Sequence, residues 1–206
     1  MSQELVVLVD DADTAIGTAE KMHVHRTGQL HRAVSVFLFD ARGRMWLQRR
    51  ALHKYHSPGL WSNACCTHPR PGESVSTAAK RRVREELGSE CSRLRSLFSF
   101  VYYAPLEDGL IEHEYDHVFA GRLDLQPTPN PQEVDAVRCI SLAELRREMN
   151  AQPECFTPWL RIAVEPVLRS RSQRYPARRD RSRHCGALRP PQRKVTGPEI
   201  GTAPDS

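Results

Sequence analysis

The sequence of 206 residues contains no long hydrophobic run. Its longest uninterrupted apolar stretches are Leu5–Val9 and Val36–Phe39, whereas a helix needs about 20 apolar residues to cross the hydrocarbon core of a bilayer. No basic residue precedes Leu5–Val9, and acidic residues follow it at once, which is unlike a secretory signal. We therefore expect no membrane partner and a cytoplasmic location.

Glycine and aromatic residues are also scarce, with 11 glycines and 7% aromatic residues, and the sequence shows no internal repeat. This composition excludes a collagen-like chain. The six cysteines do not indicate a disulfide framework, because such frameworks are typical of short secreted chains. Because 39% of the residues are hydrophobic, the chain can form a core, and its length allows one domain or one domain with a tail.

The positive charge is concentrated towards the C-terminal end. Residues 170–206 hold nine bases and three acids, whereas residues 1–169 hold 21 bases and 22 acids. The basic segment has few apolar residues and no periodicity, so we expect a disordered tail at 170–206 after a domain at 1–169. A basic arm for nucleic acid is the alternative, but only Tyr175 could stack on a base, so nucleic acid is not favoured as a partner.

The pattern of apolar residues predicts a mixed α/β fold in which helices cover both faces of a mixed sheet. A turn at 40–43 joins the first two predicted strands into a hairpin. The long segment 51–73 is predicted to be a functional loop. Strands are predicted at 33–39, 45–48, 97–103, 117–123 and 136–140, and helices at 74–87, 141–149 and 157–168.

Several residues of this sequence carry useful chemistry. Glu112 and Glu114 enter a predicted strand, where side chains two apart share a face, and two such carboxylates repel each other unless a cation lies between them. Histidines together with carboxylates suit Mn²⁺, Mg²⁺, Zn²⁺ or Fe²⁺. Sequence spacing alone does not bring these residues together. The other candidates are His25, His31, Cys66, His68, Glu85 and Glu86.

Four segments together carry a resemblance to a known family, namely HRTGQLHRAVSVFLFD, RRALHKYHSPGLWSNACCTHPRPGES, RRVREELG and EHEYDHVF. They resemble the type 1 isopentenyl-diphosphate Δ-isomerases, which belong to the Nudix fold superfamily. The resemblance runs from about Leu5 to Leu168 in the same order and with nearly the same spacing. It implies a Nudix-like mixed β-sheet sandwiched between helices in a single domain.

Three positions, Thr67, Arg82 and Ser89, depart from the Nudix pattern of G-x5-E-x7-R-E-U-x-E-E-x-G-U. Glu73, Arg81 and Glu86 match it, but Arg82 stands where the hydrolases have a metal-binding glutamate. A guanidinium group cannot hold a metal ion, but it suits a phosphate group. The alternative function, a Nudix pyrophosphohydrolase acting on a nucleoside diphosphate derivative, is therefore less favoured than an isomerase.

The resemblance also implies a reaction and its residues. The reaction is a 1,3-proton shift between isopentenyl and dimethylallyl diphosphate through a tertiary carbocation, with a small-molecule allylic or homoallylic diphosphate as the partner. Cys66 and Glu114 are implied as the acid–base pair, and Tyr102 and Trp159 as the aromatic groups that face the cation. The sequence does not fix the oligomeric state, and a monomer is favoured. The resemblance further implies a divalent ion (Mn²⁺, Mg²⁺ or Zn²⁺) at His25, His31, His68, Glu112 and Glu114, a diphosphate-bridging Mg²⁺ at Glu86, and diphosphate contacts from Lys21, Arg50, Lys54 and Arg82.

Overall fold

A computed structural model describes residues 4–91 and 93–174, within which nine strands form one sheet with four α-helices around it. The helices are α1 (Lys21–Thr27), α2 (Val75–Leu87), α3 (Leu142–Ala151) and α4 (Pro158–Arg174). The strands are β1 (Leu5–Val9), β2 (Ala15–Glu20), β3 (His31–Phe39), β4 (Met45–Arg50), β5 (Trp61–Ser62), β6 (Cys65–Thr67), β7 (Arg95–Pro105), β8 (Ile111–Arg122) and β9 (Val134–Ile140), with short 3₁₀ helices at Glu107–Gly109 and Pro153–Cys155.

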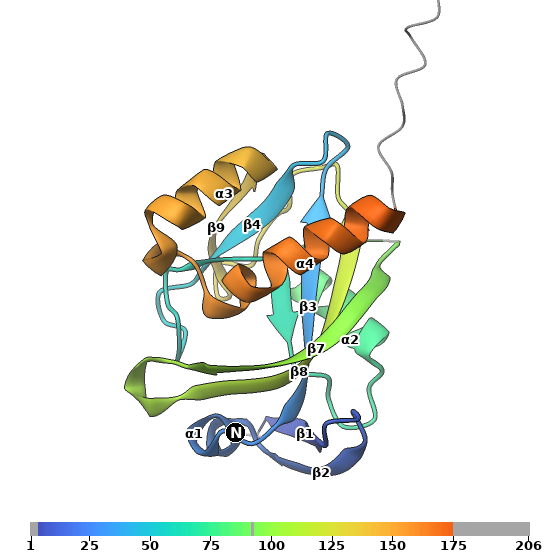
Figure 1. Cartoon of the computed structure of the whole chain (residues 1–206), viewed down its shortest axis with the longest axis vertical. Helices are drawn as coiled ribbons and strands as arrows, with labels where there is room; N and C mark the ends of the chain where they lie inside the picture. The colour runs from blue at the N-terminus through green and yellow to red at the C-terminus, as the bar shows by residue number, and fades with distance from the viewer. Residues whose placement is uncertain (1–3, 92, 175–206) are drawn as a thin grey trace, which may run out of the picture. The chain divides into compact units, whose positions relative to one another are not determined.

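Strand β3 is the centre of the sheet (Figure 1). It pairs in parallel with β8 along its whole length, from His31 opposite Glu114 to Phe39 opposite Arg122. It also pairs in the antiparallel sense with β6, β4 and, at His31, β1. Strand β8 returns from β7 as a long hairpin, and β9 extends the other side of the sheet by pairing with β4. Segments far apart in the sequence therefore meet around β3.

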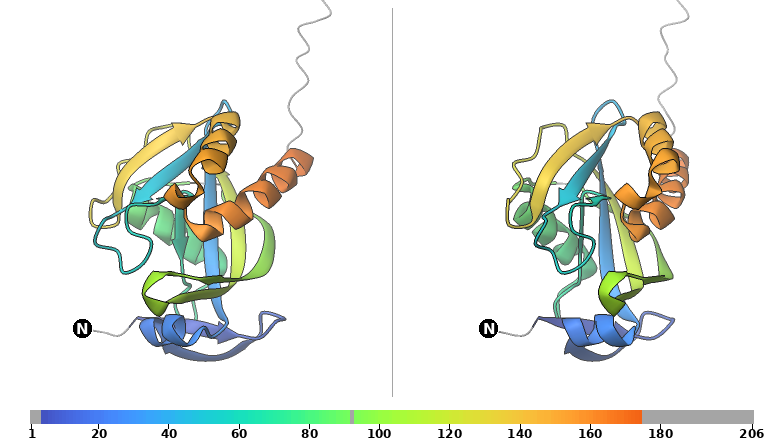
Figure 2. Two further views of the ribbon diagram at one scale, coloured as in Figure 1. Left: turned by 60° about the vertical axis from the view of Figure 1, so that its left-hand side comes forward. Right: turned by 90° about the vertical axis from the view of Figure 1, so that its left-hand side faces the viewer.

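The alternation of side chains along β3 separates two hydrophobic cores. Val34, Val36 and Leu38 face α2, whereas Phe37 and Phe39 belong to the core beneath α3 and α4. These residues are almost completely buried. Helices therefore cover both faces of the sheet, as the views in Figure 2 also show, and the predicted mixed sheet between helices is confirmed.

Most predicted elements are confirmed, because local signals determine them. Ser74 caps α2 by accepting a hydrogen bond from the backbone of Thr77, and Gly88 ends the helix at a positive φ of 57°. A capping box between Ser141 and Glu144 begins α3. Pro166 does not interrupt α4, which continues to Arg174, six residues beyond the predicted end at Leu168.

The prediction missed three parts of the fold. The hairpin of β1 and β2 and the helix α1 precede the first predicted strand, and β5 and β6 lie inside the segment predicted as a loop at 51–73. Strand β8 begins at Ile111, six residues earlier than predicted. The predicted disordered tail lies outside the described residues from 175 onwards.

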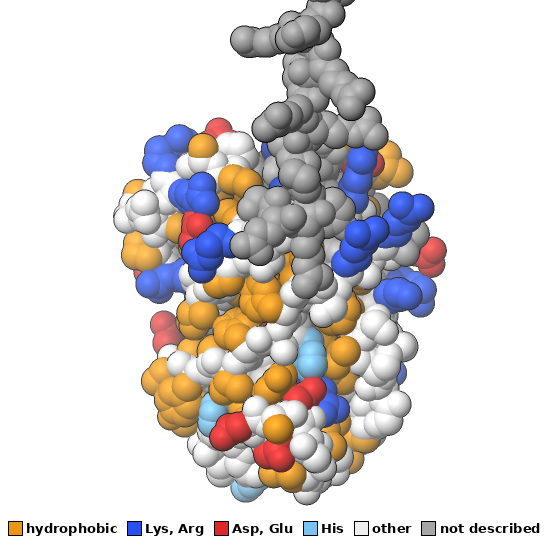
Figure 3. Space-filling view, turned by 45° about the vertical axis from the view of Figure 1, so that its right-hand side comes forward, with side chains coloured by type: hydrophobic (Ala, Val, Ile, Leu, Met, Phe, Trp, Pro, Cys, Tyr) orange, Lys and Arg blue, Asp and Glu red, His pale blue; other side chains and the backbone are white. Residues whose placement is uncertain are grey.

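None of the helices in the described part of the chain is both long and apolar enough to cross a bilayer. On the face in Figure 3, lysine and arginine side chains gather towards the end that carries α3 and α4, with hydrophobic side chains below them.

Candidate active site

Two neighbours of β3 bring the candidate residues into one cavity. Cys66 lies on β6 opposite Ser35, and Glu114 lies on β8 opposite His31, so both enter from strands that pair with β3. They line a cavity of ≈ 440 Å³. The predicted site residues Lys21, Arg50, Lys54, Cys66, His68, Arg82, Glu86, Tyr102, Glu112, Glu114 and Trp159 all line this cavity.

A cluster of three histidines and two glutamates forms one wall of the site. Its five members are His25 from α1, His31 from β3, His68 just after β6, and Glu112 and Glu114 from β8, each with one ligand atom within 4.8 Å of the others. His68 Nε2 lies 3.2 Å from His31 Nε2 and 3.0 Å from Glu114 Oε1. The structure thus brings together the five residues that the resemblance implied, in a group that could hold a metal ion.

Backbone carbonyl groups orient two of the three histidines of this cluster. His25 Nδ1 lies 2.7 Å from the carbonyl oxygen of Lys21, and His31 Nδ1 lies 2.9 Å from that of Gln29. A carbonyl oxygen only accepts, so Nδ1 is the donor in each ring. The lone pair of each neutral imidazole is then on Nε2, which faces the cluster, and this is the usual arrangement around a bound metal ion.

Burial keeps two of the three histidines in the neutral form that binds a metal ion. It lowers the pKa of His31 to about 4 and that of His68 well below its usual range, so both are neutral at pH 7. Burial and the charge of Glu112 raise the pKa of Glu114. Among the described residues, His25 Nε2 and Glu112 Oε2 are buried 3.3 Å apart, and neither atom makes a hydrogen bond. A divalent ion would satisfy both atoms, so the donor set fits one.

Cys66 lies beside this cluster, and its thiol is held in a polar environment. Its Sγ is 3.2 Å from Asn63 Nδ2 and 3.4 Å from Ser35 Oγ. Burial and the nearby charge of Asp116 raise the pKa of the Cys66 thiol, so it is protonated at neutral pH. Its neighbour in the chain, Cys65, is fully buried in the core under α2 and does not line the cavity.

Two aromatic side chains complete the wall around Cys66 and Glu114. Tyr102 Oη donates a hydrogen bond of 2.7 Å to Glu114 Oε2, and Trp159 Nε1 donates one of 2.9 Å to Ser62 Oγ. Both aromatic residues are buried and pack together in a small cluster that Cys66 also contacts. Tyr103, the next residue on β7, is 55% exposed and does not line the cavity.

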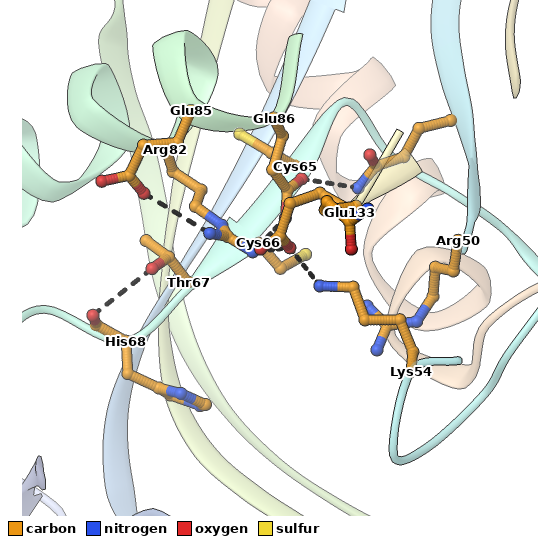
Figure 4. Close-up of polar contacts among 12 residues, drawn as sticks. Arg50, Lys54, Cys65, Cys66, Thr67, His68, Arg82, Glu85, Glu86 and Glu133 are labelled. Carbon is orange, nitrogen blue, oxygen red and sulfur yellow. Dashed lines mark hydrogen bonds and ion pairs between the residues drawn. The ribbon is translucent and has the colours of Figure 1, made fainter. Parts of the chain in front are cut away.

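Cationic side chains gather at the other end of the cavity (Figure 4). Arg82 Nη2 contacts Glu86 Oε1 at 2.5 Å, and Glu86 Oε2 accepts a hydrogen bond of 2.8 Å from Gln48. The guanidinium carbon of Arg50 lies 5.3 Å from the centre of the Trp159 ring, and Arg50 Nη2 donates a hydrogen bond to the carbonyl oxygen of His56. Lys21 is the remaining predicted phosphate contact, and its Nζ lies 3.0 Å from Glu4 Oε2.

Three residues of the site were not singled out from the sequence. His56 Nε2 lies 3.2 Å from Glu112 Oε1, and only its place in the histidine-rich segment 51–73 pointed to it. Asp116 is fully buried, and burial raises its pKa to about 7. Its spacing of two residues from Glu114 places it on the same face of the strand and could have identified it. Glu133 contacts Lys54 and Arg82, and it belongs to no recognised sequence motif.

Comparison with known proteins gives consistent results. Residues 29–160 match the NUDIX domain family. The chain is 49% identical over 171 residues to isopentenyl-diphosphate Delta-isomerase 1 of Aromatoleum aromaticum, which covers 83% of this chain and 96% of the relative. It is 43% identical over 199 residues to the isopentenyl-diphosphate Delta-isomerase of Streptomyces griseus, which covers 96% of this chain and 89% of the relative.

Solved structures share the fold. The Deinococcus radiodurans protein DR0079 superposes with a TM-score of 0.61 at 25% identity, covering 72% of this chain and 90% of that one. A MutT Nudix hydrolase from Burkholderia pseudomallei superposes with a TM-score of 0.55 at 23% identity, covering 68% of this chain and 98% of that one. These similarities show that the described domain has the Nudix fold.

Proposed function

Because the chain belongs to the isopentenyl-diphosphate Delta-isomerase family of NUDIX-domain proteins, we propose that it interconverts isopentenyl diphosphate and dimethylallyl diphosphate. The observation that carries the proposal is the single cavity that holds a thiol, a carboxyl group, two aromatic rings and a cationic end. This combination provides a proton donor, a proton acceptor and a diphosphate site around one small substrate.

The chemistry of the reaction requires two groups that exchange protons with adjacent parts of the carbon skeleton. An unactivated C=C bond gains a proton at one carbon, and a different carbon then loses one, so that the double bond moves. We assign these steps to Cys66 and Glu114, which enter the cavity from strands on different sides of β3. The hydrogen bond from Tyr102 holds the Glu114 carboxyl group in one orientation.

The intermediate of this reaction is a tertiary carbocation, which water would trap. Tyr102 and Trp159 present aromatic rings in the buried part of the cavity, and the negative face of such a ring attracts a cation by about 2 kcal/mol when water is excluded. Their burial also limits the access of water to the reacting carbons. We assign to these two rings the stabilisation of the cation.

We propose that the five-residue cluster binds a divalent ion. Its nitrogen and oxygen donors are compatible with Mn²⁺, Mg²⁺ or Zn²⁺. Such an ion would lower the pKa of the Glu114 carboxyl group and remove its repulsion with Glu112. His25, His31 and His68 would hold the ion through Nε2, and their Nδ1–H groups or burial keep them in place.

The cationic end of the cavity is the proposed diphosphate site. Arg82 has a planar guanidinium group that suits phosphate oxygens, and Arg50 and Lys54 lie on the same cavity wall. Lys21 lines the cavity from α1. Glu86 is buried at this end, and we propose that it would hold a Mg²⁺ ion, which would supply positive charge for the diphosphate.

The proposed site residues that line the cavity all lie in one chain, so one chain is sufficient to form it. We propose that the enzyme acts as a monomer in the cytoplasm. The test is incubation of the full chain with isopentenyl diphosphate and, separately, with nucleoside diphosphate derivatives. We expect dimethylallyl diphosphate in the first reaction, detected by NMR, and no phosphate release in the second. Hydrolysis of the nucleotide without isomerisation would instead identify a Nudix pyrophosphohydrolase.

A further inference from the structure

One carboxylate occupies the middle of the cationic end of the cavity. Glu133 precedes β9, and a single oxygen of its side chain, Oε2, contacts both Lys54 Nζ and Arg82 Nη2 (Figure 4). The Arg82 contact is 2.5 Å, and the Glu133 side chain is only 25% exposed. An oxygen that bridges two cations in this way stands where an oxygen of a bound anion would lie.

The two cations that Glu133 contacts already have internal anionic partners. Lys54 contacts Glu133, and Arg82 contacts Glu85, Glu86 and Glu133. Burial raises the pKa of Glu133, but Lys54 and Arg82 outweigh it and lower that pKa overall, so the carboxyl group is ionised at pH 7. A diphosphate therefore has to compete with an internal anion for the same two cations.

Backbone contacts fix the position of Glu133 independently of its side chain. The carbonyl oxygen of Glu133 accepts a hydrogen bond of 3.1 Å from Ala51, close to Lys54 in the chain. Its amide group donates to the carbonyl oxygen of Asn130, and the amide of Asn130 donates to the carbonyl oxygen of Glu86 on α2. The backbone is thus tied to both segments that carry the cations, and the side chain can leave while the backbone stays.

We propose that Glu133 is a positioning and specificity residue, which holds Lys54 and Arg82 together in the free protein and is displaced from them by the diphosphate. This inference rests on the proposed function, because it takes Lys54 and Arg82 as diphosphate contacts. Two cations so close repel each other, and the bridging carboxylate keeps them converged. The same carboxylate excludes weakly charged anions, since only a ligand with several anionic oxygens replaces both of its contacts.

The test is calorimetric titration of the full chain with inorganic pyrophosphate, and with inorganic phosphate for comparison, in a buffer that contains a chelator. In Glu133→Gln the competing charge is absent, so we expect the Kd for pyrophosphate to fall about tenfold, which corresponds to about 1.4 kcal/mol. We also expect inorganic phosphate to gain affinity by at least as much. The matched control is Asp135→Asn, which removes a carboxylate paired with Arg49 outside the cavity and should leave both affinities unchanged.

If Glu133 had a purely structural role, the Glu133→Gln substitution would weaken pyrophosphate binding. If the diphosphate displaces Glu133, the same substitution tightens pyrophosphate binding. An unchanged or raised Kd in Glu133→Gln therefore overturns the inference. Glu133→Asp provides a second variant, in which the shortened carboxylate contacts the two cations less closely, and we expect its Kd to fall about threefold. If the wild-type protein fails to isomerise isopentenyl diphosphate, the proposed function fails. If only the inference fails, the wild-type protein isomerises its substrate and Glu133→Gln shows an unchanged or raised Kd for pyrophosphate.

Discussion

Cys66 and Glu114 enter the same cavity from strands on the two sides of β3, Cys66 from β6 and Glu114 from β8. β6 pairs with β3 around Ser35, and β8 pairs with β3 from His31 onwards. The sheet therefore fixes the thiol and the carboxyl group relative to each other through backbone hydrogen bonds. Two rigidly placed groups of this kind are what a proton transfer across a small substrate requires.

The first prediction concerns the metal cluster and uses thermal stability as its measurement. A ligand that binds only the folded state at 100 times its Kd adds about 2.7 kcal/mol, which for a domain of this size raises the Tm by about 5–10 °C. We expect Mn²⁺ or Zn²⁺ to produce such a rise in chelator-treated protein. His25→Gln removes a buried member of the cluster and should abolish the rise.

His23→Gln is the matched control for this experiment, because His23 is exposed on the same helix and lies outside the cluster. This variant should keep the full rise in Tm. If His25→Gln and His23→Gln respond equally to the metal ion, the ion binds elsewhere and the five residues are not its site.

The second prediction concerns Trp159 and the carbocation. Loss of the ring removes about 1–2 kcal/mol of cation stabilisation, so we expect Trp159→Leu to lower kcat about tenfold or more. Trp159→Phe keeps a ring and should lose less. Trp46 provides the control, since it is also a buried tryptophan with a bonded Nε1 but does not line the cavity.

Steady-state kinetics at saturating substrate separate these variants. Trp46→Leu should unfold at a lower temperature and keep its kcat within about twofold, because its ring packs against α2 rather than the substrate site. Equal values of kcat in Trp159→Leu and Trp46→Leu would show that the ring of Trp159 does not act on the reaction.

The third prediction concerns pH and the ion pair between Glu73 and Arg81. Arg81 donates two hydrogen bonds to the Glu73 carboxylate, at 2.8 and 2.9 Å, and they lower the pKa of Glu73 in the folded protein. The carboxylate therefore stabilises the fold above the unfolded-state pKa of about 4.3, and this contribution is lost as the pH falls through the folded-state pKa. Glu73→Gln should reduce the free energy of unfolding at pH 7 by about 1–3 kcal/mol.

Urea denaturation at pH 7 and at pH 3 checks this expectation, and the difference between Glu73→Gln and wild type should shrink at the lower pH. Glu165→Gln is the control, because the pair of Glu165 with Arg146 is half exposed and should contribute little at either pH. A deficit in Glu73→Gln that is equally large at pH 3 would show that the ionised carboxylate is not its source.

The sequence allowed the elements with strong local signals to be predicted. Ser74 and Gly88 mark the two ends of α2, and the apolar, β-branched and aromatic residues from Val34 to Phe39 mark β3. Helix α1 escaped prediction, because its cap is Glu20, whose side chain accepts from the backbone of Met22 and His23, and glutamate is not among the usual capping residues. Strands β5 and β6 were missed because they are too short to show a periodicity.

The site itself depends on contacts that no local pattern encodes. The parallel pairing of β3 with β8 joins His31 to Glu114 across 83 residues of chain, and only the family resemblance led to that grouping. Glu133 meets Arg82 from 51 residues away in the sequence and belongs to no motif. Residues of this kind become visible only when the fold places them around one cavity.

The most direct test of the account is the isomerisation of isopentenyl diphosphate in D₂O by the wild-type chain, by Cys66→Ala and by Glu114→Gln. We expect the wild-type chain to form dimethylallyl diphosphate that carries solvent deuterium, and a chelator to stop the reaction. Both variants should remain folded and form no product, because each lacks one of the two groups that exchange protons with the substrate. Normal turnover with deuterium incorporation in either variant would contradict the assignment of Cys66 and Glu114 as the acid–base pair.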